Sequence, residues 1–230
     1  MVSIRSRFFL VLALLVLAAG LGGCGAGRLP LETLQQDLKD APTYSIILED
    51  MDVKGNFFPT YYQRYKVVQE SKEYTTDWMQ VPEEYYRRTE NFLGMTLVSK
   101  KDGKIDSDPG PAGYSYVGNP RYGQWQEGPG GSFWVFYGQY RLLSDLLGGR
   151  RVFRTDYSNY ERYRSQGRPY YGENNEFGTN GSVTRGQKPD FFARRMARLE
   201  ASRQAFSDRV ASRTGRTRMS GRGRSFGMGK

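Results

Sequence analysis

The sequence predicts an α+β protein: a small antiparallel sheet with one or two packed helices, followed by a basic amphipathic helix and a disordered tail. Three observations lead to this prediction. Short runs of β-branched and aromatic residues alternate with turn residues in the first half of the chain. Two further apolar patterns recur at helical spacing. All 17 tyrosines lie between Tyr44 and Tyr171, whereas the end of the chain is rich in arginine.

The sheet is expected from β-prone runs that are separated by turn signals. Strands are predicted over residues 43–53 and 61–69, joined as a hairpin, and over residues 92–98. The dipeptide Asp102-Gly103 then predicts a tight turn into a returning strand that begins at Ile105. Helices are expected over residues 31–38, before Pro42, and over residues 132–147, where an apolar face would pack on the sheet.

Residues 109–131 are rich in Gly and Pro and predict a long surface connection. Aromatic rings on an exposed loop can stack on a glycan or on a small solute. The alternative, which is the simpler expectation, is that these rings fold back and cap the sheet. The candidate ligand-binding residues of this loop are Tyr114, Tyr116, Tyr122 and Trp125.

The first 23 residues are arranged as a secretory signal. Arg5 and Arg7 precede an apolar run over residues 8–19, and small residues follow. This run is too short to remain as a membrane span, because a spanning helix needs about 20 apolar residues. We therefore expect a signal peptide over residues 1–23 that is removed.

Residues 21–24, Leu-Gly-Gly-Cys, resemble the lipobox of bacterial lipoproteins. In that family the cysteine sulfur receives a diacylglyceryl group, the chain is cut before the cysteine, and the new N-terminus is usually acylated, often with palmitate. The resemblance implies lipidation of Cys24 and anchoring on the non-cytoplasmic side of an envelope membrane. Since Gly25 is not the aspartate that commonly signals inner-membrane retention, it implies the outer membrane if the source is Gram-negative. An ordinary signal peptide beside an incidental cysteine is the alternative.

The composition excludes several chemistries. Cys24 is the only cysteine, and histidine is absent, which excludes Ser-His-Asp and Cys-His catalysis and zinc sites built on these ligands. Asp102, Asp106 and Asp108 do not follow the order of an EF-hand loop and predict a solvated turn. Carboxylate or Ser-Lys catalysis stays formally open, but no spacing indicates it. We therefore expect no enzyme, no cofactor and no metal site.

Charge divides the mature chain into a domain and a tail. The formal net charge is +10, yet residues 189–230 hold eleven Lys or Arg against three Asp or Glu, and residues 24–188 are neutral. A run of Tyr and Arg over residues 157–171 is typical of single-stranded nucleic-acid surfaces. Asp156 and Glu161 interrupt it and the export signal separates it from cellular nucleic acid, so this partner is disfavoured. The expected organisation is a tether over 24–30, an α+β domain over 31–172, a linker over 173–188 and a basic extension over 189–230.

The extension predicts a basic amphipathic helix that starts at Pro189 and gives way to disorder beyond Ser212. Such a helix can lie on an anionic membrane or in the groove of a partner. The apolar side would carry Phe192, Met196, Leu199, Phe206 and Val210. The opposite side would carry the candidate residues for binding an anionic surface, Arg194, Arg195, Arg198, Arg203 and Arg209.

These observations predict a lipid-anchored envelope protein with a non-enzymatic, structural or interaction role at the membrane surface. Its tail would contact anionic lipid, a surface polymer or an acidic protein. A solubilising tail with no fixed partner is the alternative for this segment. A binding module for glycan or small solute, built on the loop aromatics, is the alternative for the whole protein.

Overall fold

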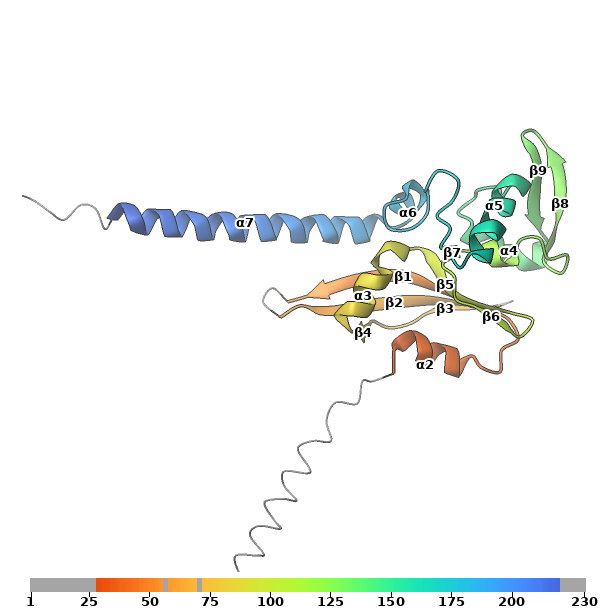
Figure 1. Ribbon diagram of the computed structural model, residues 1–230, viewed down its shortest axis with the longest axis horizontal. Helices are drawn as coiled ribbons and strands as arrows, with labels where there is room; N and C mark the ends of the chain where they lie inside the picture. Colours follow the sequence, from red (N-terminus) through yellow and green to blue (C-terminus); the bar gives the residue numbers. More distant parts are fainter. Residues whose placement is uncertain (1–27, 56–57, 70–71, 220–230) are drawn as a thin grey trace, which may run out of the picture. The chain divides into compact units, whose positions relative to one another are not determined.

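A computed structural model describes residues 28–55, 58–69 and 72–219, with the backbone alone for residues 214–219 (Figure 1). Cys24, the rest of the predicted signal and most of the predicted tether lie outside these residues. The chain divides into two compact units, residues 1–39 and 40–230. No helix in the described ranges is long and apolar enough to cross a membrane.

The described part of the first unit contains helix α2, Pro30–Asp37, close to the predicted range. Proline suits this first helical position, because its missing N–H would have no partner inside the helix. The Glu32 carboxylate accepts a hydrogen bond from the backbone N–H of Leu29, at 3.3 Å, and so caps the start of the helix.

The second unit is built on an antiparallel sheet of seven strands, which confirms the predicted α+β class. Its strand order is β3-β2-β1-β5-β6, with β4 paired to β2 and β7 paired to β5. The strands are β1 Tyr44–Lys54, β2 Thr60–Gln69, β3 Glu73–Thr75, β4 Met79–Val81, β5 Met95–Lys101, β6 Lys104–Asp106 and β7 Gly110–Pro111.

Local turn and strand signals gave two correct predictions in this sheet. Strands β1 and β2 form the expected hairpin, with Tyr44 opposite Gln69 and Lys54 opposite Thr60. The turn between β5 and β6 has positive φ at both Asp102 and Gly103, 49° and 81°. This is the conformation that an Asp-Gly turn favours.

Helices and a second, two-stranded sheet complete the unit. Helix α3 and the 3₁₀ helix η1 precede β5, whereas the remaining elements follow β7 along the chain. Their bounds are α3 Glu83–Thr89, η1 Glu90–Phe92, η2 Tyr114–Tyr116, β8 Gly123–Gly128, β9 Gly131–Phe136, η3 Gly138–Tyr140, α4 Arg141–Leu146, α5 Arg154–Ser165, α6 Ser182–Gln187 and α7 Pro189–Met219.

The prediction of one helix over residues 132–147 is wrong. Residues up to Phe136 form strand β9, which pairs with β8 and places Trp134 opposite Trp125, and only residues 138–146 are helical. A continuous apolar run satisfies a helical period and a buried strand equally well. Gly123 on β8 favours the strand, because it lets β8 and β9 approach closely. Any other residue would place its Cβ 2.2 Å from the carbonyl oxygen of Val135.

The predicted surface connection over residues 109–131 instead contains β7, η2 and β8, and residues 110–117 and 122–123 are largely packed into the core. Tyr114 belongs to one buried cluster with Met95 and Phe177, and Tyr116 and Tyr122 belong to another with Ile47 of the sheet. Large aromatic rings bury 150–250 Å² each, roughly, and this favours folding the segment back onto the sheet. This is the simpler of the two expectations for these rings.

The region predicted as an extended linker is also packed. Between residues 173 and 188 lie helix α6 and the buried side chains of Phe177, Thr179 and Thr184. The basic helix begins at Pro189 as predicted, but it continues to Met219, past Ser212, where the sequence predicts disorder. Residues 220–230 lie outside the described part of the chain.

One carboxylate organises the tyrosine-rich part of the core. The hydroxyls of Tyr114 and Tyr170, both buried, donate hydrogen bonds to the two carboxylate oxygens of Asp156 on α5. Burial, and then the hydrogen bond to Asp156, raise the pKa of each tyrosine above its usual value. Both hydroxyls therefore stay protonated and act as donors at neutral pH.

Replacing Asp156 with alanine is expected to lower the free energy of unfolding by about 2–4 kcal/mol, because two buried hydroxyls lose their acceptor. Urea unfolding of the purified chain measures this change. Asp156→Asn is the matched control, since it keeps the shape and one acceptor oxygen, and should cost about half as much. Equal, small losses in both variants would contradict this role of Asp156.

Candidate functional site

The candidate site begins with three carboxylates on β1. The register of β1 against β2 shifts between Leu48 and Asp50, so that Glu49 is an extra residue, a β-bulge. Because side chains alternate along a strand, the shift moves Asp50 and Asp52 to the face that carries Glu49. All three carboxylates therefore meet the segment formed by α6 and α7.

Each of these carboxylates forms an ion pair with that segment. Glu49 pairs with Lys188, which precedes α7. Asp50 pairs with Arg194, with 2.6 Å between Oδ1 and the guanidinium Nη2, and Asp52 pairs with Arg198. Residues 188, 194 and 198 recur at intervals that keep them beside β1, so the first turns of α7 are held along the strand.

Asp50 is the most buried of the three carboxylates, and both of its oxygens have partners. Its side chain is 10 % exposed and accepts a second guanidinium, that of Arg64 on β2, at 3.3 Å. Its Oδ1 also accepts the backbone N–H of Met51 at 2.8 Å. The guanidinium groups of Arg64 and Arg194 both lie over the ring of Trp78, at 5.0 and 5.9 Å from its centroid. Such a network is favourable because a buried charge is costly unless it is paired and hydrogen-bonded.

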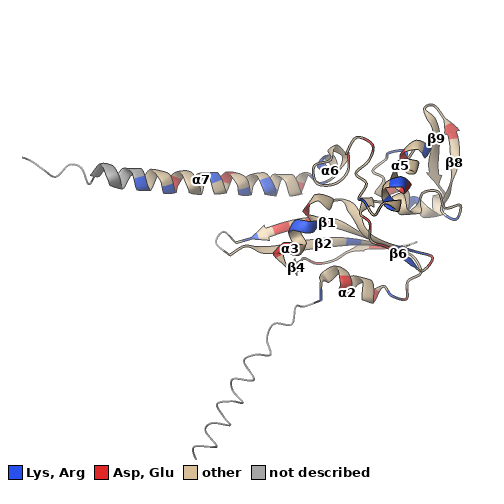
Figure 2. Ribbon diagram, viewed as in Figure 1, with Lys and Arg blue, Asp and Glu red and all other residues tan. Residues whose placement is uncertain are grey.

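The later part of α7 is exposed to solvent. Every described side chain from Arg195 to Arg213 is exposed, and Figure 2 shows basic residues along most of this helix. Four large apolar side chains, spaced by three, seven and four residues, form one row: Met196, Leu199, Phe206 and Val210, which are 54 %, 45 %, 65 % and 45 % exposed. We call these four residues the apolar row.

The docking contacts explain why this row is exposed. Leu199 follows Arg198 by one residue, which is about 100° around an α-helix, and Met196 lies about 160° from Arg198. The side of α7 that faces β1 is thus the side of Arg194 and Arg198. Leu199 lies at the edge of a cavity beside β1, and the rest of the apolar row points away from the strand. A domain that holds a helix by its basic side leaves the apolar side available.

The structure separates the five predicted anion-binding arginines. Arg194 and Arg198 pair with the domain, Arg195 lines a cavity, and Arg203 and Arg209 are exposed. The expectation that Arg203 stands opposite the apolar side is wrong. It follows Leu199 by four residues and precedes Phe206 by three, so it lies within the apolar row.

The four predicted aromatic residues do not form an exposed stacking surface. Tyr114, Tyr116 and Tyr122 are buried. Trp125 is partly buried, packs against Trp134 with 5.2 Å between ring centroids, and is covered by the guanidinium of Arg154 at 4.5 Å. The interpretation of this segment as a glycan-binding loop therefore loses its geometric support.

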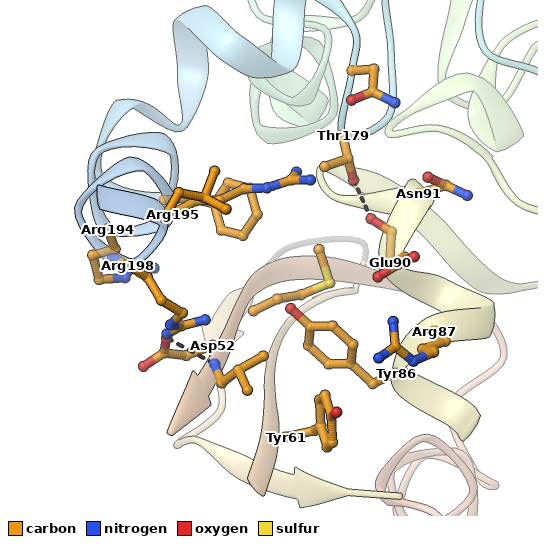
Figure 3. Close-up of a pocket in the computed structure, with 15 residues that line it drawn as sticks. Asp52, Tyr61, Tyr86, Arg87, Glu90, Asn91, Thr179, Arg194, Arg195 and Arg198 are labelled. Carbon is orange, nitrogen blue, oxygen red and sulfur yellow. Dashed lines mark hydrogen bonds and ion pairs between the residues drawn. The ribbon is translucent and has the colours of Figure 1, made fainter. Parts of the chain in front are cut away.

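A cavity of about 470 Å³ lies at the base of α7 (Figure 3). Four separate segments and Tyr61 of β2 line it. The segments are residues 51–53 of β1, residues 86–91 of α3 and η1, residues 179–180 and residues 191–199 of α7. The wall at residue 179 is fixed to η1, because the Thr179 N–H donates to the Asn91 carbonyl at 3.0 Å and the Thr179 hydroxyl donates to the Glu90 carbonyl. Sequence reasoning missed this cavity because no local motif joins the four segments.

The cavity combines a buried floor with a charged rim. The floor is formed by Met51, Tyr61, Tyr86 and Phe191, all buried, and the rim carries Arg87, Glu90 and Arg195. Burial raises the pKa of Tyr86, although the nearby guanidinium of Arg198 partly offsets this effect. Its hydroxyl therefore remains a hydrogen-bond donor at neutral pH.

Nothing in the described ranges groups three or more His, Cys, Asp or Glu side chains at metal-binding distance. Comparison with protein families, with curated proteins and with solved structures finds no match to this chain. The function is therefore argued from the docked helix, its apolar row and the cavity.

The ion pair between Asp50 and Arg194 is expected to stabilise the docked start of α7. In a double-mutant cycle, Asp50→Ala and Arg194→Ala should show a coupling energy of roughly 1 kcal/mol in the free energy of unfolding, because the carboxylate is largely buried while the arginine is partly solvated. Urea denaturation of the four proteins measures it.

The matched control for this cycle is Asp50→Ala combined with Arg203→Ala. Arg203 carries the same charge on the same helix but lies outside the docked turns, so these two changes should be additive within about 0.5 kcal/mol. Additivity of Asp50→Ala with Arg194→Ala would show that the pair does not hold the helix.

Proposed function

We propose that the protein is a lipid-anchored, non-enzymatic interaction protein of the cell envelope, and that α7 is its interaction element. The observation that carries this proposal is a long basic helix that the domain holds by one side while the apolar row is exposed. Soluble proteins rarely expose apolar side chains in such an ordered row without a use for them. The domain, in this proposal, is the support that fixes where α7 starts.

The lipobox-like residues 21–24 support the location. A diacylglyceryl group on Cys24, with a further acyl chain on its amino group, would give stable anchoring, because each buried CH₂ contributes roughly 0.8 kcal/mol. With no histidine and a single cysteine that carries lipid, the mature chain lacks the commonest nucleophile-base pairs. This composition supports a binding role over a catalytic one.

The partner that we propose for α7 is the anionic surface of the membrane that the lipid reaches. Phe206 and Val210 would enter the interface between headgroups and acyl chains, and the long stem of Arg203 lets its guanidinium reach the phosphates. Arg209 and Arg213 flank the row and, like each basic residue at such a surface, would contribute about 1 kcal/mol. The helix would thus reinforce the attachment made by the lipid.

An acidic helix of another protein is a second candidate partner, and the spacing of the row favours it. From Phe192 the sequence positions 196, 199, 203, 206 and 210 follow at alternating intervals of four and three, as in the seam of a coiled coil. Arg203 within this seam would repel the same residue of a second copy, which disfavours self-association in parallel register. A helix with a carboxylate at the facing position would satisfy it.

A photo-reactive phenylalanine analogue at position 206 tests the proposal in cells. After irradiation we expect adducts with phospholipid, identified by mass spectrometry, because Phe206 would lie in the membrane interface. The same analogue at Ile105, which is 57 % exposed on β6, is the matched control and should give none. In Cys24→Ala cells the protein should leave the envelope fraction, which separates the lipid anchor from the helix.

The outcomes of this experiment are distinct. A protein adduct at position 206 would show that α7 binds another protein instead of the membrane, which is the second candidate partner. No adduct at position 206, or equal lipid adducts at positions 206 and 105, would reject α7 as the interaction element. Membrane-extracted protein whose intact mass shows no acyl groups would reject the lipid anchor, whereas retention of the Cys24→Ala protein would be due to α7.

A further inference from the structure

We infer that the cavity at the base of α7 binds a small organic anion that carries a single phosphate or carboxylate group on a flat apolar body. This goes beyond the proposed function, because the cavity is formed by the docked start of α7 and does not need the exposed half of the helix. Its volume of about 470 Å³ lies within the range of about 300–1,000 Å³ that is typical of small-molecule sites.

The floor of the cavity suits a flat apolar group. The rings of Tyr61 and Tyr86 lie 5.0 Å apart with 49° between their planes, and Met51 and Phe191 extend this buried surface. Aromatic side chains offer large apolar faces, and a ring placed against them gains about 0.5–1.5 kcal/mol beyond the area that it buries. The floor therefore selects for an apolar body in addition to the charge.

Four arginines line the cavity, and two of them can bind an acid group: Arg195, and Arg87 once it exchanges its exposed partner Glu83. Arg194 and Arg198 are committed to Asp50 and Asp52. Arg195, by contrast, has no ion pair or side-chain hydrogen bond with any residue that the structure describes. Figure 3 shows it reaching from α7 toward the segment that carries Thr179. Its planar guanidinium matches the oxygens of a carboxylate or phosphate.

Arg87 stands on another wall of the cavity and is only weakly engaged. Its partner is Glu83, one helical turn earlier, at 2.9 Å, and both side chains are exposed. Exposed pairs of this kind contribute little, so that Arg87 can exchange Glu83 for a ligand at small cost. Two guanidinium groups from different walls would then hold one acid group between them.

Glu90 limits the charge of the ligand. Its carboxylate belongs to the rim, near Arg87. The pKa of Arg87 is raised mainly by its hydrogen bond to Glu83, and the negative charge of Glu90 adds a smaller effect. It would repel a second acid group, but would accept a hydrogen bond from a ligand hydroxyl. The cavity is therefore suited to a ligand with one acid group on an apolar body, in contrast to the polyanionic surface proposed for the exposed half of α7.

Isothermal titration of the full chain in a neutral detergent tests this inference. The acid probes are phenyl phosphate and benzoate, inorganic phosphate lacks the apolar body, and benzyl alcohol lacks the charge. We expect saturable binding of at least one acid probe, with at least roughly tenfold weaker binding of inorganic phosphate and of benzyl alcohol. Arg195→Ala should weaken binding of the acid probe by roughly tenfold or more, as loss of a charged hydrogen bond does.

Arg203→Ala is the matched control, because it removes the same charge from the same helix outside the cavity. It should leave the affinity within about twofold, and the thermal unfolding midpoints of both variants should match that of the parent chain, since both side chains are exposed. Three results would overturn the inference: no saturable binding of either acid probe, inorganic phosphate binding as tightly as the acid probes, or equal weakening by Arg195→Ala and Arg203→Ala.

Discussion

The carboxylate of Asp50 is the constraint on which the arrangement of this protein depends. It is nearly withdrawn from solvent, and a carboxylate in that position must be paired or it costs several kcal/mol. Arg64 from the neighbouring strand provides one partner, and Arg194 from α7 provides the other. The bulge at Glu49 turns this carboxylate and that of Asp52 toward α7, so a single extra residue in a strand determines which side of the basic helix faces the sheet.

Both proposed binding surfaces result from the docking of α7 onto β1. Because α7 uses its basic side to contact β1, the apolar row stays exposed, and because Arg194 and Arg198 are already paired, Arg195 is left over the cavity. The docked turns also provide the costly first hydrogen-bonded turns from which the exposed part of the helix can extend. One set of ion pairs thus supports a surface for a large partner and, beside it, a site for a small ligand.

Features that depend on neighbouring residues were predictable from the sequence, and features that depend on distant ones were not. The hairpin of β1 and β2, the Asp102-Gly103 turn and the helix that starts at Pro189 follow from local patterns. The apolar run before Phe136 was predicted as a helix, although it forms a strand. The strand depends on pairing with β8 and on the close approach at Gly123, and neither can be inferred from the run itself. The cluster of carboxylates on β1 is evident in the sequence, but the partners that dock α7 onto it, Lys188 and Arg194, lie more than 130 residues away. The cavity is beyond local reasoning for the same reason.

The central claim, that the first turns of α7 are held by the domain while the rest is presented to a partner, is tested most directly by amide hydrogen exchange. The lipidated chain would be measured in neutral detergent and again on vesicles that contain anionic phospholipid. We expect slow exchange for residues 192–198 in both conditions, and slow exchange for residues 200–213 only on the vesicles. Equal exchange along the whole of α7 in detergent, or no change over residues 200–213 on the vesicles, would contradict it.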